Sequence, residues 1–196
     1  IKKTKGAFIA FLDADDWWKN EKLNKQINFF SKNKNTNVIY SNLFLFDENK
    51  NKNKLFSKDE LYNGKVTQKL LDDFKMPILT VLFKKKIFKK YKFNKRYNII
   101  GDFDLFIRIS LNEKILSLQE PLAHYRLHPS SMSIRRLDLN ISELESWVKE
   151  NKNKKEFKYF DLSQINKKIR TLKIKNNILL GYKIKAIQEL IKIPIK

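Results

Sequence analysis

The 196-residue sequence contains no cysteine, which excludes disulfide bonds, thiolate metal sites and a thiol nucleophile. No apolar run reaches the roughly eighteen residues that a membrane-spanning helix needs, and the start lacks the pattern of a signal peptide. Because the chain starts at Ile1, just ahead of an apolar strand, we expect a fragment that lacks upstream sequence. Hydrophobic residues make up 42% of the chain, so one packed domain with an appendage is expected.

Arginine is scarce although the chain is strongly basic. The formal net charge is +21, but only six of the 42 basic residues are arginine. Arginine is the residue that holds phosphates with two parallel hydrogen bonds, so a surplus of lysine is weak evidence for a nucleic-acid groove. Residues 151–196 carry 13 basic and 3 acidic residues, about half of the surplus. An anionic membrane surface is the simplest partner for this tail, and no nucleic acid is expected.

An apolar run at residues 8–12 ends in Asp13, Ala14, Asp15 and Asp16. The run predicts a buried strand of an α/β sheet, and ligands of such sheets bind beyond the carboxyl ends of strands. Alternation along an extended chain lets Asp13 and Asp15 point the same way, and a hard cation such as Mg²⁺ or Mn²⁺ would relieve their repulsion. This pattern predicts a metal–diphosphate site. These residues alone fit equally a turn and cap that start the next helix.

A second acidic group lies at Asp102, above an apolar helical stripe in residues 101–109. By itself Asp102 fits an N-terminal-turn carboxylate that satisfies free amides. Asp104 and Arg108, four residues apart, are expected to form a structural ion pair.

A third group lies in residues 121–133, where an extended chain places His124, Arg126 and His128 on one face. Arg126 or His128 is suited to meet diphosphate oxygens or a metal, whereas a histidine near a turn is more often structural. His124 is assigned a structural role.

Apolar periodicity and turn residues predict the remaining elements. They are a helix capped by Asn20 that runs to about Lys32 with Leu23, Ile27 and Phe30 on one face, strands at 38–46 and 78–83, a solvated loop at 47–54, a short helix after Gly64, a helix and loop at 84–95, and basic helices around 141–148, 165–172 and 180–191. The last helix is able to pack on the domain or a partner, or to lie on a membrane.

Taken together, the three groups resemble the family-2 glycosyltransferases of GT-A fold. The resemblance rests on Gly6 to Asp16 followed by Trp18, Lys22-Leu23 and Gln26, on Asp102-x-Asp104-Leu105 closing at Arg108, and on Tyr125-Arg126-x-His128 followed by a serine. It implies a partial GT-A, Rossmann-like α/β sandwich over residues 1–136, with a basic helical extension at 137–196. At the position of Gly101 the family usually has a glutamate, which contacts the acceptor.

The resemblance also implies roles for individual residues. Asp13 faces the ribose or uracil, Asp15 binds the metal on the donor diphosphate, and Asp16 shapes the site. Trp18, Arg126 and His128 belong to the donor site, with His128 a second metal ligand and Ser133 a weaker candidate. Asp102 is the catalytic base.

The implied reaction is inverting transfer of a sugar from a nucleotide diphosphate, with UDP favoured and Mn²⁺ or Mg²⁺ required, to a saccharide or lipid-linked hydroxyl. Bacterial surface polysaccharide or lipopolysaccharide synthesis, in the cytoplasm or peripherally at the inner face of the cell membrane, is the expected setting.

Two other interpretations remain. A haloacid-dehalogenase-like phosphotransferase also has an Asp-x-Asp after an apolar strand, but it expects Thr or Val where Trp17 stands. A basic module that only binds nucleic acid or anionic lipid would need neither Asp15 nor Asp102, and its binding would collapse with salt. A degenerate transferase that binds without catalysis is a form of this alternative, given Gly101.

Overall fold

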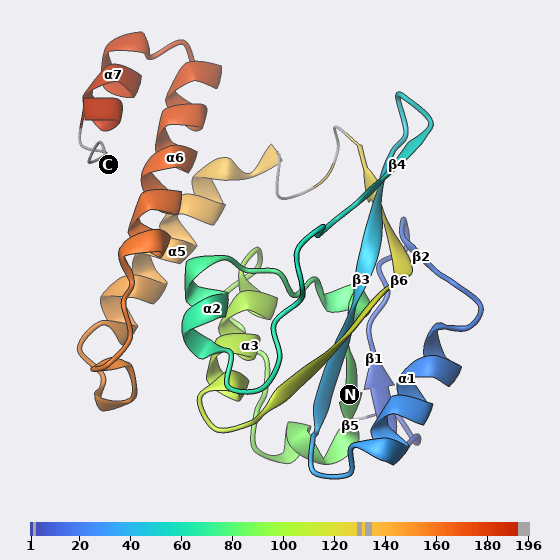
Figure 1. Cartoon of the computed structure of the whole chain (residues 1–196). Coiled ribbons are helices and arrows are strands. Elements are labelled where there is room, and N and C mark those ends of the chain that lie inside the picture. Colours follow the sequence, from blue (N-terminus) through green and yellow to red (C-terminus); the bar gives the residue numbers. More distant parts are fainter. Residues whose placement is uncertain (2, 129–130, 132–134, 192–196) are drawn as a thin grey trace.

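The computed structural model describes residues 1, 3–128, 131 and 135–191. A twisted mixed sheet forms the centre, with α1 on one face and α2 and α3 on the other, and α5 and α6 lie outside α3 (Figure 1). This arrangement is consistent with the partial GT-A, Rossmann-like fold predicted from the sequence.

Six strands form the sheet among the described residues. They are β1 (Phe8–Ala10), β2 (Trp17–Trp18), β3 (Val38–Asp47), β4 (Lys52–Leu55), β5 (Leu82–Lys84) and β6 (Ile115–Leu127). The strand order is β1-β5-β3-β6-β2, and β4 pairs with β3 as a hairpin. β3 and β6 are parallel, and the other pairs are antiparallel. β1 therefore lies at one edge of the described sheet and β2 at the other.

The helices follow the order of the predicted pattern. They are α1 (Lys22–Lys32), α2 (Thr67–Asp72), α3 (Gly101–Ser110), α5 (Leu137–Asn151), α6 (Ser163–Leu179) and α7 (Lys183–Ile191), with 3-10 turns η1 (Ile78–Thr80), η2 (Lys85–Lys89) and η3 (Lys155–Phe157). None of these helices combines the length and apolar character needed to cross a bilayer.

The two faces of β3 build separate cores because side chains alternate along a strand. Val38 and Tyr40 point into the larger cluster, which also contains apolar residues of α3, α5 and α6. Ile39 points the other way, onto Phe30 of α1 and Leu82 of β5.

Helix α5 belongs to the larger core. Trp147 is fully buried, and its ring meets that of Phe103 on α3 at a centroid distance of 5.0 Å. Ile141 and Leu144 of the same helix are also buried there. The helices that follow residue 136 therefore support α3, the helix that carries Asp102.

The strand predicted at 78–83 is wrong in its first half, which forms η1. Pro77 introduces the turn, and the Oγ1 atom of Thr80 donates a hydrogen bond to the Pro77 carbonyl at 2.6 Å. This local side-chain bond competes with a strand ladder. Extended pairing begins only at Leu82.

The loop predicted at 47–54 is wrong in its second half, which is β4. Asn51 has a φ of 48°, and asparagine tolerates this left-handed conformation better than most residues. The chain reverses there and pairs with β3, from Phe44 opposite Leu55 to Asp47 opposite Lys52.

Helix α1 also differs from its predicted face and start. It begins at Lys22 without a side-chain cap, and it buries Lys22, Gln26 and Phe30. Leu23 and Ile27 are 39% and 41% exposed. The polar pair is tolerated because Nζ of Lys22 donates to Oε1 of Gln26 at 2.8 Å, and Gln26 donates to the Thr80 carbonyl at 2.7 Å.

Candidate active site

The acidic loop, residues 11–16, follows β1 and leads to β2, which pairs with β6. The amide of Asp16 donates to the Asp13 carbonyl at 3.2 Å, which closes a turn. The chain then enters β2, where Trp17 pairs with His124 and Trp18 with Ala123 of β6. The loop therefore spans from one edge strand to the other, across the ends of the strands between them.

Asp16 is the buried member of the acidic loop, only 8% exposed. Its Oδ1 atom accepts a hydrogen bond from the amide of Arg126 at 2.8 Å. Its Oδ2 atom is buried and has no hydrogen-bond partner among the described residues. Loss of solvation, helped by the charges of Asp15 and Asp13, raises the pKa of Asp16 to about 6. Asp16 thus anchors the loop to β6.

Asp15 and His128 are brought into direct contact. Nε2 of His128, just beyond the end of β6, donates to Oδ2 of Asp15 at 2.7 Å. This hydrogen bond lowers the pKa of Asp15, with a smaller effect from the nearby Arg126 charge. Asp15 is exposed at the surface and is therefore an ionised carboxylate at neutral pH.

Asp102 lies across a cleft from the acidic loop. The cleft has a volume of about 650 Å³ and is lined by Asp13, Asp15, Pro77, Ile78, Leu79, Phe93, Tyr97, Asn98, Ile99, Gly101, Asp102, Tyr125 and Ser131. Two carboxylate groups that are far apart in the sequence thus share one cleft.

The first turn of α3 holds Asp102 in place. Its Oδ1 atom accepts a hydrogen bond from the amide of Phe103 at 2.7 Å. Loss of solvation raises the pKa of Asp102 to about 6, and the positive charge of Lys168 on α6 partly opposes that shift. A carboxylate with such a pKa is largely ionised at pH 7 and is more basic than an ordinary aspartate.

Residues 98–100, which precede Asp102 at the cleft wall, are held by a side chain of α5. The carboxylate of Glu143 accepts hydrogen bonds from the amides of Asn98, Ile99 and Ile100 at 2.8, 2.9 and 3.1 Å. Glu143 is 5% exposed. A buried carboxylate is stable there because backbone amides solvate it.

The neighbouring ion pair on α3 is structural, as the spacing predicts. Arg108 donates to Oδ2 of Asp104 at 2.7 Å, and the indole of Trp147 donates to the other oxygen at 3.1 Å. Neither Glu143 nor Trp147 was identified from the sequence. They lie four residues apart on one face of α5, and that spacing was the available signal.

Arg126 and Trp18 are not among the residues that line the cleft. The guanidinium of Arg126 lies 5.9 Å from the centre of the Trp17 ring and 3.6 Å from Glu48. Trp18 donates its indole N–H to the Leu79 carbonyl at 2.9 Å. Both support the cleft through neighbours, because Arg126 holds Asp16 and Trp18 holds Leu79, a cleft residue.

The remaining candidates are also placed. His124 stacks on Trp17 with ring centroids 4.8 Å apart, and Arg126 also contacts the Trp17 ring. Tyr125, which lies between them in the sequence, lines the cleft. Gly101 lines the cleft at the start of α3. Ser133 lies outside the described residues.

The donor atoms fit a hard cation that takes only one or two ligands from the protein. Among the described residues no group of three or more His, Asp or Glu side chains is arranged to hold a metal. Asp15 offers an ionised oxygen, and the unpartnered oxygen of Asp16 lies in the same loop. Mg²⁺ in particular combines one or two carboxylates with substrate phosphates.

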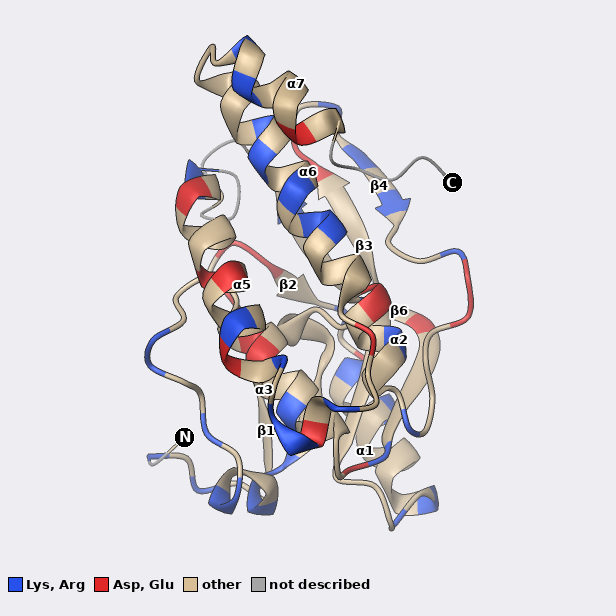
Figure 2. Ribbon diagram, turned by 90° about the vertical axis from the view of Figure 1, so that its left-hand side faces the viewer, with Lys and Arg blue, Asp and Glu red and all other residues tan. Residues whose placement is uncertain are grey.

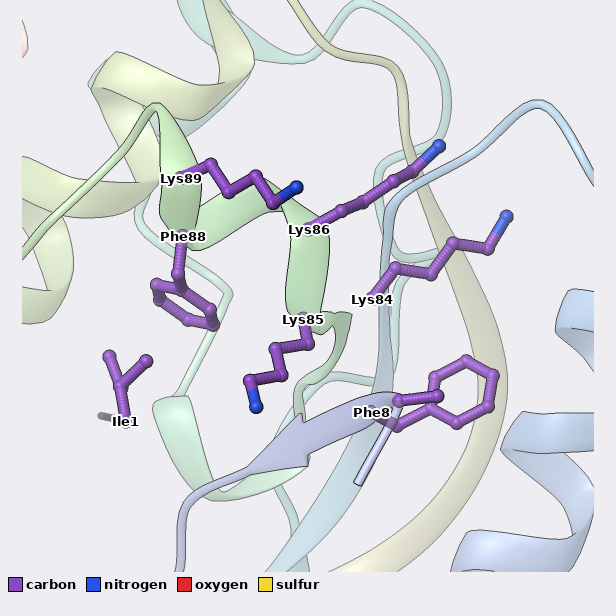
Figure 3. Close-up of a pocket in the computed structure, with 8 residues that line it drawn as sticks. Ile1, Phe8, Lys84, Lys85, Lys86, Phe88 and Lys89 are labelled. Carbon is purple, nitrogen blue, oxygen red and sulfur yellow. The ribbon is translucent and has the colours of Figure 1, made fainter. Parts of the chain in front are cut away.

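A second cavity, of about 640 Å³, lies beside β1 and η2 (Figure 3). Lysines 84, 85, 86 and 89 and apolar residues line it, and none of the candidate site residues does. It is therefore separate from the acidic cleft.

Comparison with known proteins identifies the family of this chain. The sequence model described as "Glycosyl transferase family 2" matches residues 1–111, which contain the acidic loop and Asp102. The chain belongs to glycosyltransferase family 2. The dehalogenase-like interpretation is thereby excluded.

Two curated relatives support the assignment. An uncharacterised glycosyltransferase of Methanocaldococcus jannaschii is 30% identical over 129 residues, which are 65% of this chain and 44% of that protein. An uncharacterised glycosyltransferase of Rickettsia bellii is 25% identical over 178 residues, 89% of this chain and 25% of that protein. The chain thus spans less than half the length of either relative.

Proposed function

We propose that the acidic cleft transfers a sugar from a nucleotide diphosphate to an acceptor hydroxyl. The observation that carries this proposal is that Asp13, Asp15 and Asp102 line one cleft of about 650 Å³. Such a cleft offers an anionic edge for a cation–diphosphate complex and a separate base for the acceptor. A UDP-sugar is the favoured donor, and a hexose the favoured sugar.

The diphosphate is bound at the Asp15 edge of the cleft. A Mn²⁺ or Mg²⁺ ion held by Asp15, with His128 as second ligand, supplies compensation for the negative charge that develops on the leaving diphosphate. To act as ligands, Nε2 of His128 and Oδ2 of Asp15 give up the 2.7 Å hydrogen bond that joins them. Asp13 lies beside them and faces the nucleoside.

Asp102 acts as the base. Its carboxylate accepts the proton of the acceptor hydroxyl while that oxygen attacks the anomeric carbon and the bond to the diphosphate breaks. A single displacement of this kind inverts the anomeric configuration. Its raised pKa, about 6, makes Asp102 a better base than an ordinary aspartate and leaves it ionised at neutral pH.

The acceptor is a saccharide or lipid-linked hydroxyl, as in bacterial surface polysaccharide or lipopolysaccharide synthesis, and the setting is cytoplasmic. Gly101 stands at the cleft wall where a longer side chain would narrow the acceptor side. A shorter residue there leaves room for a bulky acceptor.

Titration calorimetry of UDP with and without Mn²⁺ tests the donor site directly. We expect binding that requires Mn²⁺ and that is lost in Asp15→Ala. Asp59→Ala is the matched control, because Asp59 is an exposed carboxylate outside the cleft lining. If UDP and the other nucleoside diphosphates fail to bind with Mn²⁺ present, the proposal is wrong.

A further inference from the structure

Helix α7 exposes its large apolar side chains instead of burying them. Ile184, Ile187 and Ile191 follow helical spacing along one face and are 75%, 57% and 77% exposed. Ala186, on the opposite face, is 6% exposed and is the buried residue of this helix. A helix on a water-exposed surface normally turns its apolar stripe toward the core. In α7 the small residue faces the protein and the large apolar residues face outward.

The exposed apolar surface continues into the end of α6. Ile178, Leu179 and Leu180 are 61%, 66% and 57% exposed. Most of the large apolar side chains that are exposed in the described part of the chain lie between residues 178 and 191. We name residues 178–191 the α6–α7 surface.

The turn between the helices fixes the direction of this surface. Gly181 has a φ of 76°, and its amide donates to the Ile178 carbonyl at 3.0 Å. The amide of Tyr182 donates to the Asn177 carbonyl at 2.8 Å. These two bonds form a Schellman motif, which ends α6 and folds α7 back beside it (Figure 1). The outward direction of the isoleucines therefore follows from a defined helix end.

The charge around this surface has one sign. Helices α6 and α7 carry seven Lys and Arg residues and one acidic residue, Glu189. Blue residues follow one another along α6 in Figure 2. Lys183 and Lys185 are exposed on α7 itself, beside the isoleucine face.

These charges select among possible occupants. A second copy of this chain would bring two proteins of net charge +21 together, and like charges repel. An anionic bilayer offers both requirements at once, because its headgroups attract lysine and its acyl boundary accepts isoleucine.

We propose that the α6–α7 surface docks on an anionic lipid bilayer. Ile184, Ile187 and Ile191 enter the boundary between headgroups and acyl chains, and Lys183 and Lys185 contact the headgroups. The α6–α7 surface lies outside the acidic cleft, so this proposal stands independently of the transferase reaction.

Co-sedimentation of the full chain with vesicles tests the apolar part. The probes are phosphatidylcholine vesicles with and without phosphatidylglycerol. We expect strong binding only with phosphatidylglycerol, and a loss of roughly tenfold or more in the triple variant Ile184→Ser/Ile187→Ser/Ile191→Ser. Leu23→Ser/Ile27→Ser is the control, because it removes exposed apolar side chains from α1, outside the α6–α7 surface, and should leave binding unchanged.

The charged part is tested with Lys183→Gln/Lys185→Gln. We expect weaker binding to phosphatidylglycerol vesicles and loss of binding with added salt. Lys52→Gln/Lys54→Gln removes two exposed lysines from β4 and should have a smaller effect. If the isoleucine variant binds vesicles like the wild type, insertion is overturned.

Light scattering separates the other occupants. A concentration-dependent dimer that the triple isoleucine variant abolishes, without vesicle binding by the wild type, would overturn the proposal in favour of a second copy. Nucleotide binding by the same variant should remain intact. Loss of vesicle binding with retained UDP binding therefore distinguishes this surface from the cleft.

Discussion

Nε2 of His128 lies 2.7 Å from Oδ2 of Asp15, although 113 residues separate them in the sequence. This bond joins the chain beyond β6 to the acidic loop. The hydrogen bond lowers the pKa of the Asp15 carboxyl below its ordinary value. The two atoms proposed as metal ligands are thus already adjacent.

Replacing His128 with alanine should weaken Mn²⁺-dependent UDP binding by roughly 10–100-fold, because one ligand and the orientation of Asp15 are lost together. The pKa of Asp15 should also rise toward its ordinary value, which ¹³C NMR of the carboxyl reports. His124→Ala is the matched control, since His124 stacks on Trp17 away from the cleft lining. Equal effects of the two histidine variants on UDP affinity would contradict the role given to His128.

Replacing Asp102 with asparagine should lower kcat by roughly 10²–10⁴-fold while UDP binding is retained, because the variant removes the base but keeps the shape. The wild-type kcat/KM should rise with pH through about 6, the pKa of Asp102. Asp138→Asn is the control, because Asp138 lies in the first turn of another helix, α5, outside the cleft. Full transfer by Asp102→Asn would exclude this residue as the base.

Replacing Glu143 with alanine should lower the free energy of unfolding by about 3 kcal/mol or more, because three backbone amides lose a charged acceptor. Urea unfolding measures this change. Glu145→Ala on the same helix is the control, since Glu145 is exposed and forms an ion pair with Lys173. A similar small effect of both variants would show that the amides of residues 98–100 do not depend on Glu143.

Replacing Gly101 with alanine should raise the free energy of unfolding by about 0.4–1 kcal/mol, because alanine restricts the unfolded chain. There is space for it, since an added Cβ would meet only the Phe93 ring, at 3.9 Å. Thermal unfolding measures the gain. Gly181→Ala should instead destabilise, because its φ of 76° strains any side chain. Destabilisation by Gly101→Ala would mean that the glycine serves the backbone rather than the cleft.

The sequence was most informative where chemistry and periodicity coincide. An apolar strand followed by Asp13, Asp15 and Asp16 predicted a loop at a strand end, and the structure has one. The helix that begins near Asp102 was predicted by its apolar stripe and is α3. The ion pair of Asp104 and Arg108 followed from the four-residue spacing alone. Such features depend on local spacing and are therefore readable from one sequence.

Features that depend on distant partners were missed. The buried face of α1 contains Lys22 and Gln26, which are tolerated only because Thr80 accepts the final hydrogen bond. The spacing of Glu143 and Trp147 places them on one face of α5, but it does not reveal the three amide partners of Glu143, which lie more than forty residues away. The neighbours of Arg126, the Trp17 ring and Glu48, were likewise not predicted from the sequence. Tertiary contacts decide these cases, and local pattern does not encode them.

Asp16 should make the protein less stable as the pH rises from about 4 to about 6. Its folded pKa is about 6 against a usual 3.8, so the folded state holds the proton more tightly than the unfolded state. That stabilisation is complete below the unfolded pKa and is lost as the pH rises through the folded pKa. Asp16→Asn keeps an oxygen for the Arg126 amide and does not titrate, so its stability relative to the wild type should increase across this window.

Urea unfolding of both proteins at a series of pH values measures that difference. Asp138→Asn provides the opposite sign, because hydrogen bonding and the nearby Arg136 lower the pKa of Asp138. The stabilisation by Asp138 is lost as the pH falls below the usual value, so Asp138→Asn should gain relative stability only in acid. A difference between Asp16→Asn and the wild type that stays flat from about pH 4 to 7 would mean that the Asp16 carboxyl is solvated in the folded protein. The buried oxygen of Asp16 would then have a partner.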